Sequence, residues 1–542
     1  MGAKIRMKRM DSAFVAKTLL IFSTIFEIIV LVYFNFFNIH AAVDQDYAQL
    51  LFHAMQMADK NKILLDNWYY STTGEFDCPM LLAALFYKIC GNIYYAYAIS
   101  NLVNIVVWIF ALYTLMENAG VSTYGKAVAA CLVFTTYDFS ILYYTNMMFI
   151  RGSQYTIKVL LPIMFIAVLS CSENERKSIK NIILLILFYF LSFLTAFSSG
   201  IYVFLCGFFP VIICTLVYYV FDKNFKDKKY YYVNILGTIA ATVFGIFFGK
   251  LSDFTVKSDN FMIRNDVDII DALGNSIGDL FWAFRLFPDY PVSVNSVEAI
   301  GIVVRWCVIA LICFGFFSIT KAFALKRYGR YDSEQSTRDF VSTSLISVFV
   351  FTILLLTLIP SRIRYQLIGA IPLMLVATIN IEDWANKMQI IYKYVFYALC
   401  GMIFFANSIF SISFDAKQWL NGEKSEYQID YDLNAKIKRV LDENEVEIAY
   451  VLNHSQFRAG LTLSDCDRRY AFIDSDGQIG AGWDNYTKTG RSNNPDFGKR
   501  NAIIYTQSKG DRPEFINNYS LIANIDEYEI YFSDENYLEN NE

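Results

Sequence analysis

The chain has 542 residues, of which 55% are hydrophobic and 17% aromatic, and its mean hydropathy is +0.35. Charged residues make up 18% of the chain, fewer than the roughly 25% usual for soluble domains. This composition excludes an ordinary soluble domain and indicates a polytopic membrane protein. The net charge of −5 excludes little, because charge is partitioned between the two sides of a membrane, and no motif indicates a nucleic-acid partner.

The apolar runs predict about eleven membrane spans, since a helix needs roughly 20 residues to cross a bilayer. A basic N-terminus precedes the first run and is expected in the cytoplasm. Lys and Arg then recur in alternate loops, which leaves the loops 38–93 and 251–298 and the tail after residue 413 outside. The predicted spans lie near residues 13–37, 94–116, 126–144, 155–170, 182–198, 201–221, 232–249, 299–320, 340–358, 366–381 and 392–413.

The first outer loop, residues 38–93, opens on two carboxylates, Asp44 and Asp46. Carboxylates at a membrane edge are costly unless they bind or transform something. Residues 46–57 have helical spacing and predict an amphipathic helix on the membrane surface. A second short apolar stretch starts at Pro79, which is well tolerated in the first turn of a helix. The loop is therefore predicted to hold two surface helices.

The polar tail, residues 414–542, predicts a small α/β domain outside the membrane. Helical spacing covers residues 432–444. Four short runs of strand-forming residues lie at 447–452, 469–473, 502–506 and 528–532. The predicted fold class is thus mostly α, with a transmembrane bundle at residues 1–413 and a soluble α/β domain at 414–542.

This order of parts resembles the GT-C superfamily of membrane glycosyltransferases, which take sugars from polyprenyl-phosphate carriers. The resemblance covers roughly residues 1–415. It rests on a first span, the acidic motif Asp-Gln-Asp-Tyr-Ala at 44–48, and the stretch Pro-Met-Leu-Leu at 79–82 before the second span. Many members have a double proline where this chain has Cys78 and Pro79.

The resemblance implies a transferase acting outside the cytoplasm. It would move a hexosyl, pentosyl or aminosugar group from a polyprenyl-phosphate donor to a glycan, lipid or protein acceptor, in a single displacement that inverts the anomeric centre. A composition rich in Asn, Ile, Tyr and Lys indicates a bacterial plasma membrane.

The acidic motif supplies the catalytic residues that the resemblance implies. Asp44 would be the general base on the acceptor hydroxyl. Asp46 would bind acceptor hydroxyls or a divalent cation, Mg²⁺ or Mn²⁺, for which carboxylate oxygens are suitable ligands. The alternative is that both aspartates only cap the surface helix.

A lipid-phosphate donor leaves an anion at the membrane edge, and cations must stabilise the developing charge. The candidates at the predicted outer edge are Arg151, Lys158, Arg362 and Arg364. Arg suits phosphate because its planar fork binds two oxygens. The alternative is that these side chains extend to lipid head groups.

Substrate contacts are expected from carboxylates and aromatic rings of the outer loops. The candidates are His53, Asp268, Trp282 and Arg285. A solvated loop explains the acidic residue Asp268 equally well, and His53 is also compatible with an ordinary surface-helix residue.

Two other classes of function stay open from the sequence. A transporter or flippase of lipid-linked glycans would also have many spans and outer cations, but it should show charged or broken helices at mid-membrane. A non-catalytic subunit of an envelope-glycan assembly, with its outer domain binding a partner, is the third possibility.

Overall fold

The structure is a computed structural model that divides into two compact units, which we describe separately. Unit 1 consists of Met1–Phe37, Thr72–Pro79 and Asn101–Asn421, and unit 2 of Asn38–Ser71, Met80–Ser100 and Gly422–Glu542. The structure describes residues 2–65, 68, 74–137, 139, 143–150, 155–221, 228–252, 268–287, 291–325, 333–358, 363–416, 429–477, 479, 499–535 and 538. Within these ranges the side chains of residues 2–11, 45, 46, 221, 228, 316–325, 333–336, 363, 364, 455 and 456 are not described.

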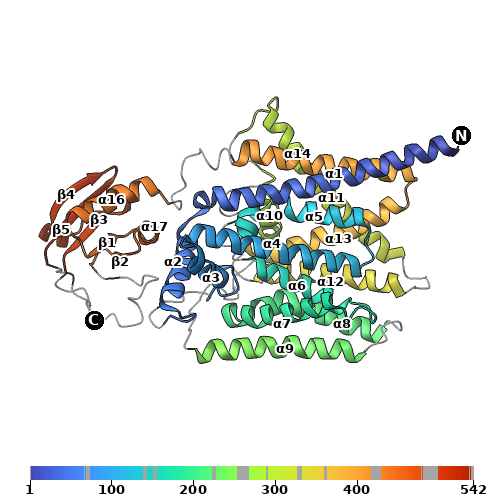
Figure 1. The fold of residues 1–542 in the computed structure, drawn as a ribbon, viewed down its shortest axis with the longest axis horizontal. Coiled ribbons are helices and arrows are strands. Elements are labelled where there is room, and N and C mark those ends of the chain that lie inside the picture. Colours follow the sequence, from blue (N-terminus) through green and yellow to red (C-terminus); the bar gives the residue numbers. More distant parts are fainter. Residues whose placement is uncertain are drawn as a thin grey trace. The chain divides into compact units, whose positions relative to one another are not determined.

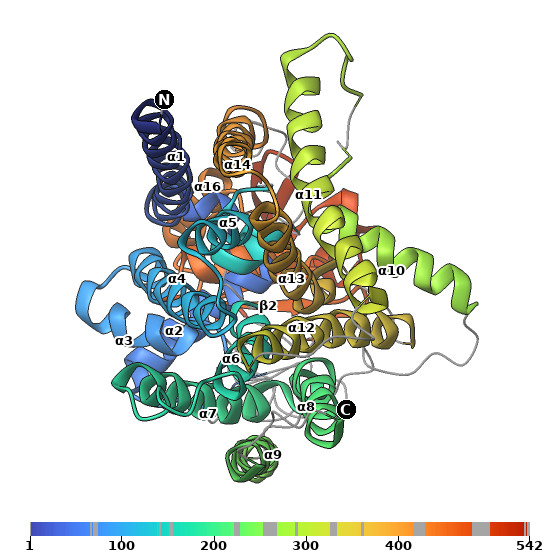
Figure 2. The ribbon, with the colours of Figure 1, turned by 90° about the vertical axis from the view of Figure 1, so that its right-hand side faces the viewer.

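Unit 1 is a bundle of helices (Figures 1 and 2). The long first helix, α1, packs against α5 and α14, and α13 packs against α11 and α12. The helices are α1 (Gly2–Phe37), α5 (Thr123–Phe134), α6 (Thr156–Leu169), α7 (Ile179–Ser199), α8 (Phe209–Phe221), α9 (Lys228–Leu251), α10 (Ile269–Ala283), α11 (Val297–Leu325), α12 (Ser333–Leu358), α13 (Leu367–Asn386) and α14 (Ile390–Phe410), with α4 (Ile93–Asn118) entering from unit 2.

Several irregular turns interrupt this bundle. Single π-helical turns are η2 (Asn146–Ile150), η3 (Phe204–Phe208) and η7 (Ser411–Ala416), and η6 (Ile363–Gln366) is a 3-10 turn. π-turns are rare and are found frequently at functional sites.

Eight helices of the described chain are long and apolar enough to cross a membrane. They coincide with eight of the predicted spans. The other three predicted spans coincide with apolar helices of only 10–17 residues, at Thr123–Phe134, Thr156–Leu169 and Phe204–Val220, which are shorter than the roughly 20 residues that a bilayer needs. The predicted class, a polytopic helical membrane protein with a small C-terminal α/β domain, is confirmed.

The largest correction to the spans concerns residues 126–144. The helix there, α5, has 12 residues and ends at Phe134, with Thr135 in an extended conformation. Two β-branched threonines, Thr135 and Thr136, follow the apolar run, and such residues lose rotamer freedom in a helix. The predicted break after Ser198 is confirmed, because α7 ends at Ser199 and Gly200 has a φ of +67°.

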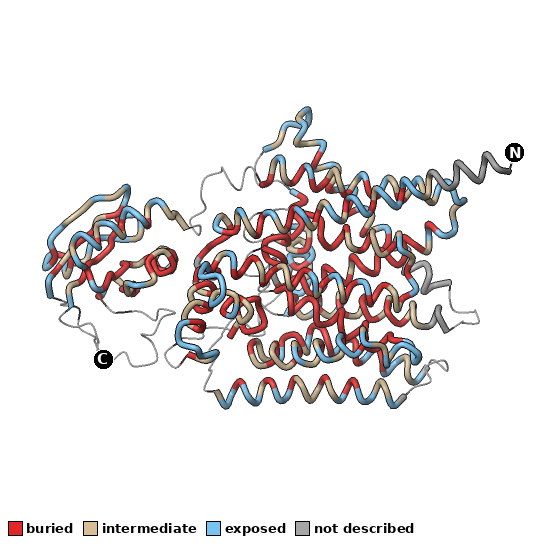
Figure 3. Tube along the Cα trace, in the orientation of Figure 1, coloured by how far each residue is buried: buried red, intermediate tan, exposed pale blue. Residues whose placement is uncertain are grey.

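The α7–α9 pair shows how neighbouring spans approach closely. A Cβ atom added at Gly245 would lie 2.5 Å from the carbonyl oxygen of Phe193, and one added at Gly249 would lie 2.9 Å from that of Phe197. Two glycines four residues apart therefore let the backbones meet, as is common between membrane helices. The opposite face of α9 is exposed along much of its length (Figure 3).

The C-terminal part of unit 2 is a five-stranded mixed sheet of order β2-β1-β3-β5-β4 (Figure 1). Strands β1, β2 and β3 run parallel, whereas β3 and β5, and β5 and β4, are antiparallel. The elements are α16 (Tyr431–Glu443), β1 (Ile448–Leu452), α17 (Ser455–Ser464), β2 (Arg469–Ile473), β3 (Asn501–Tyr505), β4 (Ser520–Ile525) and β5 (Tyr528–Ser533). Four strands and α16 match the prediction, whereas α17 and β4 were not predicted.

Both faces of the central strand β1 are buried. Ile448, Tyr450 and Leu452 belong to one hydrophobic core, and Ala449 and Val451 to the core that includes side chains of α16 and α17. This follows from the alternation of side chains along a strand. A central parallel strand that is covered on both faces is therefore encoded by a continuous apolar run rather than by an alternating one.

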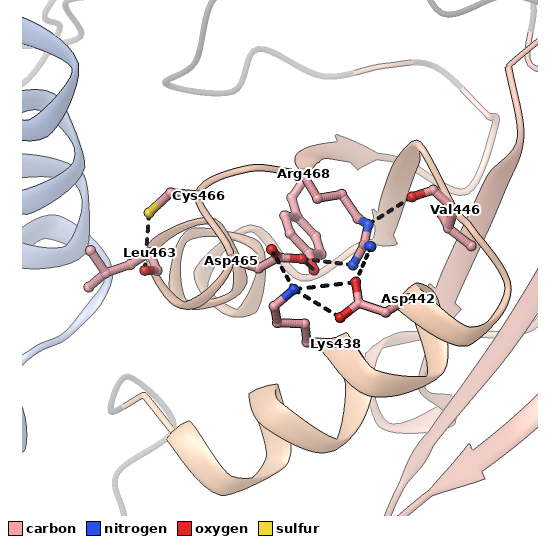
Figure 4. Close-up of polar contacts among 8 residues, drawn as sticks. Lys438, Asp442, Val446, Leu463, Asp465, Cys466 and Arg468 are labelled. Carbon is pink, nitrogen blue, oxygen red and sulfur yellow. Dashed lines mark hydrogen bonds and ion pairs between the residues drawn. The ribbon is translucent and has the colours of Figure 1, made fainter. Parts of the chain in front are cut away.

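A charged network joins α16 to the turn before β2 (Figure 4). Arg468 pairs with Asp465 at 2.7 Å and with Asp442 at 2.5 Å, and its Nε donates to the carbonyl oxygen of Val446 at 2.8 Å. Lys438 contacts both carboxylates, at 3.0 Å and 3.2 Å. Hydrogen bonds from Arg468, and then from Lys438, hold the pKa of Asp442 below its usual value.

The predicted surface helices of the first outer loop are present as α2 (Gln45–Lys60) and α3 (Met80–Cys90), within unit 2. The apolar stripe of α2, formed by Leu50, Ala54 and Met57, is buried. Helix α2 packs against α3 and against α17 of the sheet domain. Protein therefore covers this stripe, and a position on the membrane surface stays a prediction, as does the domain boundary at residue 413.

Candidate functional site

Asp44 is the N-cap of α2. Its Oδ1 accepts a hydrogen bond from the backbone N–H of Tyr47 at 3.0 Å, and its backbone oxygen accepts from Ala48 at 2.7 Å. Its exposed fraction is 6%. The capping alternative from the sequence is thus realised, but in a buried carboxylate. A catalytic role of Asp44 stays a prediction.

Four predicted site residues have side chains outside the described part of the structure. Arg151 and Arg362 lie in segments that are not described, and only the backbones of Asp46 and Arg364 are described, in α2 and η6. The predicted roles of these residues stay predictions.

His53 lies on α2 with an exposed fraction of 2%. Its ring stacks on that of Trp68, with centroids 4.2 Å apart and planes 11° apart. Burial lowers the pKa of His53 to about 3, because the charged imidazolium loses its hydration. At neutral pH this side chain is an uncharged aromatic ring.

Of the four predicted phosphate-binding cations, Lys158 has a described side chain, and this side chain pairs with an acidic residue. Its Nζ lies 3.0 Å from Oδ2 and 3.2 Å from Oδ1 of Asp77. The hydroxyl of Ser199 donates to Oδ2 of Asp77 at 3.1 Å. Both charged side chains are buried, with exposed fractions of 8% for Lys158 and 0% for Asp77. A buried charge needs such a partner.

Tyrosine rings lie beside this ion pair in unit 1. Lys158 Nζ lies 5.6 Å from the ring centroid of Tyr155. The ring of Tyr365, next to Arg364 in the chain, has its centroid 6.1 Å from that of Tyr155 and 6.0 Å from that of Tyr202. A cation near an aromatic face is favourable. The three tyrosine rings connect the N-terminal ends of α6 and η3 with η6.

The sequence reasoning missed Asp77. It lies two residues before the Pro-Met-Leu-Leu stretch at 79–82, on which the family resemblance partly rests. A lysine inside an apolar helix such as α6 signals that an acidic partner exists somewhere. Asp77 and Lys158 are 81 residues apart in the chain, so no local sequence pattern identifies Asp77 as the partner.

The three candidates around α10 have different structural environments. Asp268 caps α10 by accepting from the backbone N–H groups of Ile270 and Asp271 at 2.8 Å and 3.3 Å. Trp282 is 37% exposed. Arg285 is buried, has a φ of +45°, and accepts through its carbonyl oxygen from Arg305 at 3.1 Å. The cap and the exposed ring fit the solvated-loop alternative, and substrate contact for all three stays a prediction.

Of the predicted residues, Asp44 and His53 therefore share α2 in unit 2, whereas Lys158 and the three residues of α10 and its C-terminal end belong to unit 1. Among the described side chains, no group of three or more His, Cys, Asp or Glu residues is placed to hold a metal ion.

Comparison with known proteins places the fold. No protein-family model and no curated protein sequence matches the chain. Its structure is similar to the crystal structure of ArnT from Cupriavidus metallidurans bound to undecaprenyl phosphate, with a TM-score of 0.50 over 94% of this chain and 98% of that chain. The sequence identity is 9%, so the similarity establishes a shared fold.

Proposed function

We propose that this protein is an integral-membrane glycosyltransferase of the GT-C type that uses a polyprenyl-phosphate sugar donor. The observation that carries the proposal is the fold shared along almost the whole chain with ArnT, whose crystal structure contains undecaprenyl phosphate. The buried Asp44 at the start of α2, directly after the first span, supports it. The acceptor would be a glycan, lipid or protein outside the cytoplasm.

In the proposed reaction Asp44 acts as the general base. Its carboxylate accepts the proton of the acceptor hydroxyl while the hydroxyl oxygen attacks the anomeric carbon. The bond from that carbon to the phosphate oxygen breaks, and polyprenyl phosphate leaves with the electron pair. Attack opposite the leaving group inverts the anomeric centre. General base catalysis of this kind contributes about 10²–10⁴-fold.

Lys158 is proposed to stabilise the charge that develops on the leaving phosphate. Asp77 holds the ammonium at 3.0 Å and so fixes its position before the donor binds, which is how electrostatic catalysis avoids reorganisation. Arg151, Arg362 and Arg364 are proposed as further phosphate ligands, because the guanidinium fork binds two oxygens.

The remaining candidates are proposed to bind the acceptor and the sugar. His53 would contribute an uncharged ring, consistent with a pKa lowered to about 3 by burial. Asp268, Trp282 and Arg285 would contact the sugar. Asp46 would bind acceptor hydroxyls or a divalent cation.

The proposed location is the bacterial plasma membrane, with the N-terminus in the cytoplasm and the sheet domain outside. The distribution of Lys and Arg over the loops supports this orientation.

The proposal is tested with the purified full-length protein in lipid nanodiscs. Polyprenyl-phosphate sugars and a crude envelope acceptor fraction are added, and the release of free polyprenyl phosphate is followed. Wild type is compared with Asp44→Asn and with the matched control Asp430→Asn. Asp430 is also an N-cap, of α16, and accepts from Asp432 and Leu433. Asn is a good N-cap, so both variants should fold.

Asp44→Asn is expected to lower the rate by about 10²–10⁴-fold, whereas Asp430→Asn should leave it unchanged. Release that is indifferent to Asp44→Asn would refute the base assignment. No release from any donor would favour the transporter or the non-catalytic subunit instead.

A further inference from the structure

A carboxyl group lies inside the membrane-spanning part of unit 1. Glu27 belongs to the span Ser12–Phe37 of α1 and is fully buried. Polar side chains from α1, α5 and α14 surround the group, with the hydroxyl of Ser23 at 3.4 Å from Oε1. The surrounding residues are Ser23, Cys131, Thr135 and Ser408.

No basic side chain of the described chain pairs with Glu27. The buried cation linked to the same region, Arg305, is paired with Asp415 and donates to Ser411 at 2.9 Å. Ser411 in turn donates to the carbonyl oxygen of Thr136 at 2.6 Å. A lone carboxylate in a bilayer is expensive, and such residues usually mark functional sites. A carboxyl group in this position is neutralised either by a proton or by a bound cation.

Three buried oxygens in this region accept no hydrogen bond from any described residue. They are Oε2 of Glu27, Oγ1 of Thr136 and Oδ1 of Asn407. The Asn407 amide nitrogen donates to Oγ1 of Thr135 and to the carbonyl oxygen of Thr136, each at 3.2 Å. A carbonyl oxygen can only accept, so the amide orientation is set and its oxygen is available as a ligand.

The side chains of Glu27 and Asn407 are connected through that of Thr135. Oγ1 of Thr135 lies 3.2 Å from the hydroxyl of Ser408 and receives the Asn407 amide, and Thr135 also adjoins the Glu27 carboxyl. A single proton on Glu27 would supply one donor to a group of three acceptors. Buried unsatisfied oxygens in native proteins call for a bound water or ion, and a cation would be coordinated by several of these acceptors at once.

The backbone favours a cation at the same place. Helix α5 is too short to span a bilayer and ends at Phe134, immediately before Thr135 and Thr136. Two of its last carbonyls accept from Tyr137 and Tyr144. The C-terminus of a helix carries partial negative charge, and broken helix ends of this kind coordinate sodium in membrane transporters.

We propose that Glu27, Thr135, Thr136, Asn407 and Ser408 form a binding site for a sodium ion between α1, α5 and α14. All the ligand atoms are oxygens, which hard cations prefer. One carboxylate matches a monovalent ion, whereas a divalent ion would bring one uncompensated positive charge into the bundle. The ion would tie three helices together, and the site does not depend on the proposed transferase activity.

The test uses the purified full-length protein in detergent, free of other alkali cations. Apparent melting temperature is measured in sodium, potassium and choline chloride at equal ionic strength, and binding of radioactive sodium is measured directly. We expect the melting temperature to be about 2–4 °C higher in sodium chloride than in choline chloride, because a ligand that binds only the folded state stabilises it.

Glu27→Gln should abolish both the sodium-dependent shift and the binding, while its melting temperature in choline chloride stays at or above that of wild type. The matched control is Glu382→Gln. Glu382 is also buried, but it lies 4.0 Å from Arg338 and accepts from the backbone of Ser122 at 2.8 Å. This variant should keep the full sodium response.

Thr135→Val keeps the side-chain shape and removes one ligand, so it should raise the half-saturating sodium concentration about tenfold or more. It also provides a test if Glu27→Gln fails to fold. A wild-type melting temperature that is equal in sodium and choline chloride would overturn the proposal. So would a Glu27→Gln or Thr135→Val protein that responds to sodium as wild type does.

Discussion

The buried pair of Lys158 and Asp77 should dominate the stability of unit 1 around the start of α6. Its exposed fractions are 8% and 0%, and the ammonium contacts both carboxylate oxygens, at 3.0 Å and 3.2 Å. Removing one partner of a buried pair leaves an uncompensated charge and costs about 3–5 kcal/mol. Lys158→Met and Asp77→Asn should each reach that range.

The double variant is the decisive comparison. Lys158→Met with Asp77→Asn removes both charges, so the second change relieves part of the cost of the first. We expect the double variant to be about 2–3 kcal/mol more stable than the sum of the single effects predicts, because the two residues are in contact. The hydroxyl of Ser199, which donates to Asp77 at 3.1 Å, keeps an acceptor in the Asn variant.

The free energy of unfolding is measured in mixed micelles with increasing SDS, followed by tryptophan fluorescence. Lys126→Met is the control, since Lys126 lies 3.8 Å from Glu117 and the two side chains are 15% and 38% exposed. Such a partly exposed pair should contribute about 1 kcal/mol or less. The reasoning is refuted if Lys158→Met costs no more than Lys126→Met, or if the double variant equals the sum of the singles.

Two further predictions concern unit 2. The pKa of His53 is lowered to about 3 by burial, whereas an unfolded histidine titrates near about 6.5. Between these two pH values the unfolded chain binds a proton that the folded chain does not bind. The free energy of unfolding should therefore fall by about 1.4 kcal/mol for each pH unit as the pH is lowered from about 6.5 toward about 3. His53→Phe should remove this part of the slope in denaturant titrations at several pH values, and an unchanged slope would contradict the burial. Arg468→Met should cost about 2–3 kcal/mol, since Asp465 has a side-chain exposure of 2% and loses a charged donor at 2.7 Å. Lys436→Met, which breaks an exposed pair with Asp526, should cost under about 1 kcal/mol, and equal losses for the two variants would argue against the network.

Local patterns were sufficient for most of the elements. Eight spans, helix α2 with its buried Leu50, Ala54 and Met57, and strands β1, β2, β3 and β5 all lie where apolar periodicity predicts them. Strand β4 was missed because none of its residues is buried: half are exposed and half have intermediate burial, so no clear apolar alternation marks it.

The candidate site was only partly accessible from the sequence. Asp44 was predicted as a candidate because it stands at a recognisable place, after a span and before a helix, and its role stays a prediction. Its burial, and the choice of Asp77 as partner of Lys158, come from packing between segments far apart in the chain. The predicted span 126–144 was also wrong, because α5 ends at Phe134. Hydropathy does not show where a helix ends within an apolar run.

The sequence by itself thus determined that this is a helical membrane protein, where its spans and most strands lie, and where a first-loop carboxylate stands. These properties depend on side-chain periodicity and composition, which act over a few turns of chain. Only the tertiary structure decided that Lys158 is neutralised by Asp77, that His53 stays uncharged against Trp68, and that Glu27 gathers oxygens from three helices. Charge, burial and hydrogen bonding depend on which distant residues share one low-dielectric space, and that is set by the packing of the folded chain.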